Sequence, residues 1–391
     1  MKLLDWHFNK ELVPVSYLTK IGGVRWVLYG YLFLAIFQGM LANNRPILVV
    51  SEKNITFPIF SQNAIGLPVE NLKGKFSVWP IVKFRYSDID SSVPPLSPPF
   101  TLSKTSDGGI HWLGTDHIGR DVLAGVLRGM YISMIIGVFG SLGAAVLGIW
   151  IGMWAGYQNI TKLRMNLFQA LWLLFNIGVS VYVLVFVNSS WFKFLGLLVW
   201  WTISYTTYQG LRFENKWLQI QIPLDAMVVR IMEIKKSIPS LILILALVGF
   251  FGTTSLSSLF SLIIGLGWFG FAGITRAETL ITGRQSFVES ARALGISKSR
   301  IVFRHILPSI WPPLAVYACM MVGSNIIIES SLSFIGLGLA PEEQSWGTMI
   351  AEARKYPSAW WLYLCPGICM VVVILMFQRL SSRVQKILNS G

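Results

Sequence analysis

The sequence contains few charged residues and very few cysteines. Asp, Glu, Lys and Arg make up 13% of the 391 residues, hydrophobic residues make up 54%, and the mean hydropathy is +0.60. This composition excludes an ordinary soluble domain, in which about a quarter of the residues are charged. The three cysteines, Cys319, Cys365 and Cys369, all fall in apolar runs, and no metal-ligand spacing or disulfide framework is present. We interpret them as packing residues.

Long apolar runs dominate the sequence. A helix that crosses a bilayer needs about 20 mainly apolar residues, and about eight such runs are centred near residues 33, 143, 178, 200, 246, 266, 319 and 368. Because lipid leaves backbone polar groups unpaired, only helices and closed barrels span membranes, and these runs are too long and too uniformly apolar for barrel strands. The sequence therefore predicts an all-α, polytopic membrane protein. The first run follows more than twenty polar and charged residues, so we expect an anchor rather than a cleaved signal.

The distribution of charge predicts the orientation. If the N-terminus is cytoplasmic, most of the 32 Lys and Arg residues fall on the inside, and those outside lie mainly in the long segment 42–112. Long segments count little toward orientation. We therefore expect eight crossings with both termini in the cytoplasm. The net charge of +14 is then positive-inside bias, not a sign of a nucleic-acid partner.

Residues 42–112 differ in composition from the rest. They contain strand-like runs (PILVV, ITFPIF, FSVWPIVKF) and end in a segment rich in Pro and Ser. We expect a small, partly β external insert followed by a linker. Either a passive cap or a docking surface for an external partner fits this segment.

Three further stretches have charged residues, glycines or a proline at predicted membrane boundaries. Residues 113–121 (LGTDHIGRD) crowd two glycines with an Arg and two Asp residues, which predicts an interfacial elbow. Residues 222–244 predict a basic interfacial turn with Pro239 opening a span. In residues 329–356, Glu329 lies near the end of an apolar helix and is either a functional group or an interfacial carboxylate.

The glycines Gly336 and Gly338 suit a non-helical re-entrant turn, with Trp346 as its anchor at the interface. Packing alone accounts for them equally well.

Residues 287–308 (FVESARALGISKSRIVFRHILP) form a polar, basic segment between apolar runs. Phe287, Ala291 and Leu294 recur on one face of a short amphipathic helix. Gly295 then permits a turn, Ser297 caps a second helix, and Pro308 ends that helix where the next span begins. An ordinary basic interfacial helix is the alternative.

These stretches together resemble the permease subunits of the dipeptide/oligopeptide/nickel class of ABC importers. LGTDHIGRD, followed by AGY at 155–157, is similar to one family pattern, and Asp225, Arg230, Glu233 and Pro239 match the spacing of another. ESSLSFIGLGLAP with Trp346-Gly347 resembles a third. Residues 289–308 resemble the family's EAA motif, E-A-A-x3-G-x9-(I or H)-x-L-P, in which Ser290 replaces the second small residue.

The resemblance covers residues 113–157 and 222–378, and the chain departs from it in several places. Ala124-Gly125 and Gln158-Asn159 replace family residues, and the tail FQRLSSRVQKILNSG is not acidic. Residues 158–221 add two apolar runs between motifs that the family keeps adjacent. The resemblance thus implies the type I importer permease fold, with six core spans plus an inserted helical hairpin. A pair of crossings leaves every later loop on its original side.

The family resemblance also implies the function. Two homologous permeases, here a hetero-dimer, form a pathway for peptides or similar small solutes in the bacterial inner membrane. An external solute-binding protein delivers the solute, and two cytosolic ATPases bind ATP. The chain has no G-x4-G-K-S/T phosphate loop, so we expect a transport subunit that is not an enzyme and binds no cofactor or metal of its own.

The implied sites form three groups. The residues expected to couple to the ATPases are Glu289, Ser290, Ala291, Arg292, Gly295, Arg300, His305 and Pro308. The external elbow comprises Gly114, Asp116, Gly119, Arg120 and Asp121. The candidates for an external gate are Glu329, Gly336, Gly338 and Trp346.

The expected organisation follows the composition. It comprises an N-terminus with the first span (1–41), the insert (42–112), the elbow with the second span (113–157), the hairpin (158–221) and the core permease domain (222–391).

Two other classes of protein compete with this interpretation. An ion-coupled secondary transporter would place ionisable groups at the midplane in broken helices, and the predicted span interiors are almost free of them. A membrane scaffold would use residues 287–308 only for docking. The sequence leaves open the solute, the direction of transport beyond resemblance, and whether the permease pair is a homo- or hetero-dimer.

Overall fold

The computed structural model describes residues 23–50, 55–58, 76–104, 108–161, 164–166, 219–221, 224–251, 255–340 and 342–389, together with positions 176, 200–202 and 204. The first 22 residues and nearly all of the predicted hairpin lie outside these ranges. The strands β6 (Arg164–Asn166) and β7 (Gln219–Gln221) pair with each other where the hairpin segment begins and ends.

Long apolar helices make up the described chain. In chain order they are α3 (Gly23–Ile36), α4 (Gln38–Leu41), α5 (Val122–Met134), α6 (Gly140–Thr161), α9 (Leu224–Ser237), α10 (Ser240–Phe251), α11 (Leu256–Thr282), α12 (Ser286–Ala293), α13 (Lys298–Ile301), α14 (Leu307–Ile335), α15 (Trp346–Ala353) and α16 (Trp361–Asn389). Two five-residue π-turns, η4 (Ile135–Phe139) and η6 (Val302–Ile306), join α5 to α6 and α13 to α14.

Four helical segments are long and apolar enough to cross a membrane: 122–157, 256–282, 302–335 and 361–387. Two shorter apolar helices, within α3 and α10, accompany them in the described residues. The all-α, polytopic prediction is confirmed. The predicted total of eight spans stays a prediction, because the hairpin falls outside the described ranges.

Small residues allow the two central helices to pack closely. Gly148, Gly152 and Gly156 recur every fourth position on α6 and face α11. A Cβ atom at Gly152 would lie 2.5 Å from the carbonyl oxygen of Ala272, so only glycine permits this approach. Such small-residue contacts are a usual means of joining helices in lipid, where burial of apolar surface gives no net driving force.

The crossing formed by α9 and α10 is interrupted at Pro239, and it runs antiparallel to α11. Asp225 at its start pairs with Arg276, Met232 lies next to Gly273, and Leu243 and Ile244 lie near Leu262 and Ile263. The break therefore lies at the middle of α11, not at a membrane boundary. The predicted interfacial turn at 222–244 was wrong, because α9 packs along one half of α11 and α10 along the other.

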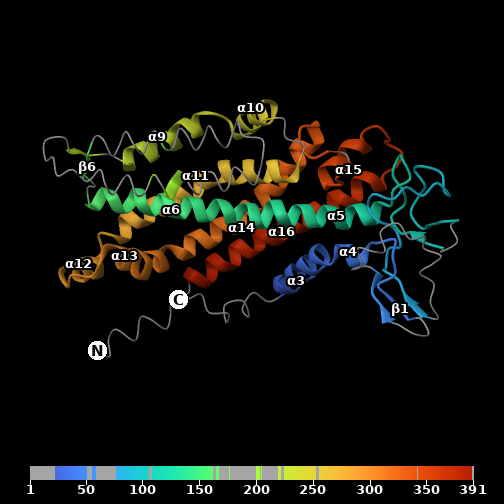
Figure 1. Ribbon diagram of the computed structural model, residues 1–391, viewed down its shortest axis with the longest axis horizontal. Helices are drawn as coiled ribbons and strands as arrows, with labels where there is room; N and C mark the ends of the chain where they lie inside the picture. The colour runs from blue at the N-terminus through green and yellow to red at the C-terminus, as the bar shows by residue number, and fades with distance from the viewer. Residues whose placement is uncertain are drawn as a thin grey trace.

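The elements define two ends of an elongated bundle (Figure 1). One end carries α12 and α13. The other carries α15 and the strands β1 (Leu48–Val50), β2 (Ile55–Thr56), β3 (Phe76–Val78), β4 (Thr101–Leu102) and β5 (Ile110–His111), arranged as the sheets β2-β1-β3 and β4-β5. These strands lie in the described part of residues 42–112, the segment predicted to be partly β. We call residues 287–308 the handle and residues 113–121 the elbow, and we name the two ends after them.

Candidate functional sites

The handle consists of two short helices joined by a tight turn at Gly295. The backbone there has φ +74°, a left-handed conformation that strains any residue with a Cβ. The amide of Gly295 donates to the carbonyl of Arg292, and the amide of Ile296 donates to that of Ala291, so the turn closes the end of α12. The motif has glycine at position 295 because the backbone of this turn requires a positive φ.

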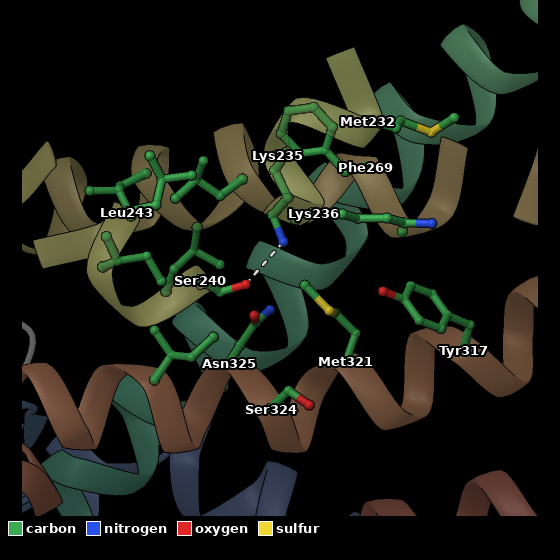
Figure 2. A pocket seen from close by; sticks show the side chains of 17 residues that line it. Met232, Lys235, Lys236, Ser240, Leu243, Phe269, Tyr317, Met321, Ser324 and Asn325 are labelled. Carbon is green, nitrogen blue, oxygen red and sulfur yellow. Dashed lines mark hydrogen bonds between the residues drawn. The ribbon is translucent and has the colours of Figure 1, made fainter. Parts of the chain in front are cut away.

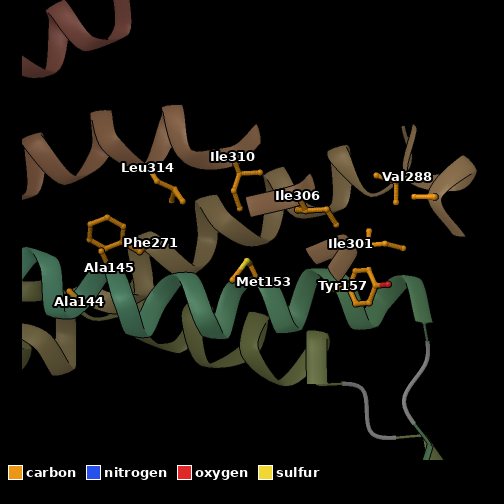
Figure 3. Close-up of a cluster of buried hydrophobic side chains, with 11 residues drawn as sticks. Ala144, Ala145, Met153, Tyr157, Phe271, Val288, Ile301, Ile306, Ile310 and Leu314 are labelled. Carbon is orange, nitrogen blue, oxygen red and sulfur yellow. The ribbon is translucent and has the colours of Figure 1, made fainter. Parts of the chain in front are cut away.

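Apolar side chains bind the handle to the helix bundle. Val288, Ala291, Ile301 and Ile306 are buried together with residues of three long helices, namely Met153, Tyr157, Phe271, Ile310 and Leu314. Figure 3 shows this cluster extending along α6 beneath the handle. The handle thus shares one buried cluster with residues of α6, α11 and α14.

The outer face of the handle is exposed and mixed in character. Leu294 is 79% exposed and Phe287 is 42% exposed, and the side chains of Glu289 and Arg300 are also exposed. Of the three residues predicted to share one helical face, only Ala291 is buried. Val288 lies underneath together with Ala291.

The remaining handle residues mostly contact their own chain. The guanidinium of half-buried Arg292 lies 5.7 Å from the ring centre of Tyr157, and the imidazole of His305 lies 6.4 Å from the ring of Phe287. Ser290 donates to the carbonyl of Ser286. Pro308 does not end the second helix as predicted. The wider π-turn η6 precedes it, and Pro308 occupies the first turn of α14, where its missing N–H matters least.

Buried ion pairs organise the elbow. The carboxylate of Asp116 accepts hydrogen bonds from the amides of Ile118 and Arg120 and from Arg120 Nε at 2.6 Å. Gly114 and Gly119 have φ +78° and +92°, so both turns need glycine. Asp116 and Arg120, which the sequence analysis grouped in the elbow, therefore contact each other in the structure.

Asp121 links the elbow to a histidine that the sequence analysis did not select. Its carboxylate caps α5 by accepting from Ala124 N at 2.8 Å, and it also lies 2.8 Å from His111 Nδ1. The other ring nitrogen lies 3.1 Å from Asp90. His111 is fully buried between the two carboxylates, with Phe84 stacked on its ring.

The charges around His111 shift two pKa values. Burial alone would lower the pKa of His111, but its hydrogen bonds to Asp121 and Asp90 and their charges raise it. Burial alone would raise the pKa of Asp90, but hydrogen bonds from Ser103, Ser92 and His111 hold it at about 2. At neutral pH this arrangement favours an imidazolium between two carboxylates.

Acidic residues near α15 join distant parts of the chain to the elbow. Arg120 Nη2 lies 3.3 Å from the carboxylate of Glu352, and Arg128 donates to Glu343 at 2.5 Å. Asp116, His117 and Glu352 offer ligand atoms within 4.8 Å of one another. Arg120 already pairs with both carboxylates and supplies the positive charge that a cation would bring.

Three of the gate candidates, Glu329, Gly338 and Trp346, are buried, and Gly336 is exposed. Glu329 is fully buried within α14 and accepts from Ser333 at 2.9 Å and from Ser330 at 3.2 Å. Gly336 ends α14 at φ +86°, which agrees with the predicted non-helical turn. Trp346 is not an interface anchor. It is fully buried and donates to the carbonyl of Val126, because Gly129 leaves room for its indole.

A cavity of about 350 Å³ lies between the broken crossing α9–α10, α11 and α14 (Figure 2). Lys235, Lys236 and Ser240 line it at the break, and Tyr317 and Asn325 line it from α14. The sequence analysis counted both lysines as loop residues at a boundary. Only the antiparallel packing against α11 reveals that they lie at mid-depth.

The described chain combines apolar helices long enough to span a membrane, a mainly apolar cavity lined by two lysines, and an exposed handle at one end. This combination is typical of a membrane transport subunit. Residues 218–389 match the family described as the inner membrane component of binding-protein-dependent transport systems. The match lies in the C-terminal part of the chain, and the similar proteins are permease subunits of ABC importers for peptides and related solutes. The chain is a multi-pass inner membrane protein, and ATP binding belongs to the ATPase subunits of such importers.

Several similar proteins are named as permeases of transport systems. The chain is 25% identical to the peptidoglycan transport permease YejE of Agrobacterium fabrum, over 89% of this chain and 84% of the relative. It is 25% identical to the dipeptide permease DppC of Alkalihalophilus pseudofirmus, over 71% of each chain. It is 36% identical to the oligopeptide permease OppC of Escherichia coli, over 42% of this chain and 55% of the relative.

A solved structure of the MetNI methionine ABC transporter aligns at a TM-score of 0.33 and 16% identity, covering 65% of this chain and 96% of that one. This likeness is too low to support an argument.

The comparisons also favour a permease over the competing classes of protein. The sequence argument against a secondary transporter relied on predicted span interiors that are almost free of ionisable groups, and the cavity beside Pro239 lies next to two lysines outside those predicted spans. The α9–α10 crossing is broken at mid-depth and carries two lysines there. The match of residues 218–389 to the permease family, not the position of these charges, argues against the ion-coupled alternative.

Proposed function

We propose that this chain forms one half of the translocation pathway of an importer for peptides or similar small solutes, and that the handle receives the closing movement of a cytosolic ATPase. The relatives named for dipeptide, oligopeptide and peptidoglycan transport support the solute class. The partners would be a second, homologous permease in a hetero-dimer, two ATPases and an external solute-binding protein.

The construction of the handle is the observation that carries this proposal. Its outer face exposes Phe287 and Leu294 among charged side chains, as protein interfaces combine apolar anchors with a polar rim. Its inner face is packed into α6, α11 and α14. A partner that moves the outer face would therefore move three membrane helices, which is the differential contact that coupling between two states requires.

The orientation follows from the same proposal. The handle end, with both termini, would face the cytoplasm, and the elbow end would face outward toward the solute-binding protein. The surplus of Lys and Arg assigned to the handle side supports this orientation. Glu329, Gly336 and Gly338 would then lie beside the external mouth of the pathway.

Two handle variants test the coupling role. Gly295→Pro cannot adopt φ +74°, because the proline ring holds φ near −65°, and Glu289→Lys reverses one exposed charge. We expect both variants to insert in the membrane but to lose ATPase association in co-purification and ATP-driven uptake in proteoliposomes.

Glu342→Lys is the matched control, because it reverses an exposed acidic residue at the elbow end and should leave coupling unchanged. Normal association and uptake in both handle variants would refute the coupling role.

A further inference from the structure

The mid-depth cavity carries positive charge without a matching negative charge. Lys235 donates to Ser240 Oγ at 3.0 Å, and neither Lys235 nor Lys236 has a carboxylate within 4.0 Å in the part of the chain that the structure describes. The neighbouring acid, Glu233, pairs with Arg230 instead. Ionisable groups at membrane depth are expensive, and they mark the paths of substrates or ions.

Their depth excludes a role at the lipid headgroups. The cavity touches α11 at Leu266, Gly267 and Gly270, which lie near the centre of a helix spanning 256–282. It touches α14 from Tyr317 to Ile328, again in the middle of a span. Figure 2 shows the Lys235 ammonium directed from α9 toward Ser240 and the side of the cavity that holds Asn325. Both lysines therefore line the cavity beside the middle of these spans.

Asn325 adds an unpaired acceptor to the same cavity. Ser141 donates its hydroxyl hydrogen to the carbonyl of Gly137 at 2.6 Å, so its oxygen must accept from Asn325 Nδ2 at 3.0 Å. This fixes the amide orientation and leaves Asn325 Oδ1 without a partner, although the residue is only 1% exposed. A buried, unpaired acceptor is costly unless a ligand supplies a donor.

The break at Pro239 contributes further positive potential. The first turn of α10, a helix of 12 residues, lines the cavity through Ser240 and Leu243. The amides of a first helical turn carry partial positive charge and favour anions. Broken helices of this kind form the midplane binding sites of many transporters.

We propose that this cavity is a binding subsite for the carboxylate of the transported solute. The ammonium groups of Lys235 and Lys236 neutralise the carboxylate, and Asn325 Oδ1 accepts from an adjacent N–H of the solute. The favoured class is a small anionic solute that carries an amide N–H next to a carboxylate, such as a short peptide with a free C-terminus. A volume of about 350 Å³ lies in the range of small-molecule sites, about 300 to 1,000 Å³. The inference rests on the proposed function.

The test compares two solutes in the complete reconstituted importer. Uptake of one short peptide is measured with a free C-terminal carboxylate and with a C-terminal amide, in the wild type and in the double variant Lys235→Gln, Lys236→Gln. The solute-binding protein is the same in both transporters, so its own preference cancels in the ratio of variant to wild type. We expect KM for the carboxylate peptide to rise about tenfold and KM for the amide to stay within about twofold.

Two further variants control for folding and general charge. The double variant Lys235→Arg, Lys236→Arg retains the positive charges and should retain the selectivity. Lys355→Gln removes an exposed lysine at the elbow end and should change neither peptide.

Equal loss of both peptides in the Gln variant would overturn the proposal and would indicate that the lysines pair with an acidic residue of the partner permease. Unchanged uptake of both peptides, or failure of the Gln variant alone to assemble, would overturn it as well. If the wild-type importer takes up neither peptide, the proposed function itself fails, and that outcome is distinct from a wild type that transports both while the variant leaves their ratio unchanged.

Discussion

Buried charges hold the elbow end together, whereas apolar side chains hold the handle to the bundle. At the elbow end, Asp116, Arg120 and Glu352 join a loop to a helix more than two hundred residues away in the chain. At the handle end, Val288 and Ile301 are fully buried, and the charges of Glu289 and Arg300 point away from the protein.

The two arrangements suit different tasks. A buried ion pair has one good geometry and is costly to break, so it gives the elbow end a defined shape. Apolar contacts tolerate small shifts without leaving an unpaired charge, so the handle can move with its helices while its outer face meets a partner. The comparison predicts that variants at the elbow end cost stability, and that variants of the handle anchors cost coupling as well.

The largest effect should come from Asp116→Ala, which leaves the buried Arg120 guanidinium without its 2.6 Å partner. We expect a loss of about 3–5 kcal/mol in the free energy of unfolding, as when one member of a buried pair is removed. The measurement is thermal unfolding of the detergent-solubilised protein.

Glu233→Gln is the matched control, since it breaks the exposed Arg230–Glu233 pair and should cost less than about 1 kcal/mol. If both variants lost the same free energy of unfolding, the buried ion pair at the elbow end would be no more important for stability than an exposed pair.

A smaller effect is expected at the handle anchor. Ile301→Ala opens a cavity in the cluster of Figure 3 and should cost about 2–4 kcal/mol. Hydrogen exchange should rise in residues 286–306 and remain unchanged at the elbow, and ATPase stimulation should fall. Phe303→Ala removes a side chain that is 59% exposed and serves as the control. Exchange that rises equally at both ends would contradict the comparison.

The smallest effect is a pH dependence confined to the elbow end. The pKa of His111 is raised on folding, so its contribution to stability is complete below about 6.5 and is lost as the pH rises through the folded-state pKa. Asp90, whose pKa is lowered to about 2, contributes above its ordinary value of 3.8 and loses that contribution only in strong acid. We expect the unfolding temperature to fall between pH 6 and 9.

His111→Gln tests the origin of this slope. The variant keeps a polar side chain in the site but cannot titrate, so its unfolding temperature should be flatter across the same pH window. An unchanged slope in this variant would assign the pH dependence to other groups.

Local patterns in the sequence predicted several features correctly. The apolar runs predicted the spanning helices, and Gly295 and Gly336 predicted turns that need positive φ. Pairings between distant residues were not predictable in this way. Arg128 and Glu343 lie 215 positions apart, and nothing in the neighbourhood of either residue indicates the other. The buried face of α12 was not predictable either, because its apolar periodicity fits Phe287 and Leu294 as readily as Val288.

The amino-acid sequence alone determined that this is a membrane protein. Its long apolar runs can form helices that pair their own backbone polar groups and present apolar side chains to lipid. It also determined the handle, because the residues of that motif act within a short stretch of chain. The tertiary structure decided the depth of Lys235 and Lys236, which depends on how α9 and α10 lie along α11. Burial and charge pairing depend on three-dimensional neighbours, so a residue that appears interfacial in the sequence can line a cavity beside the middle of the spanning helices.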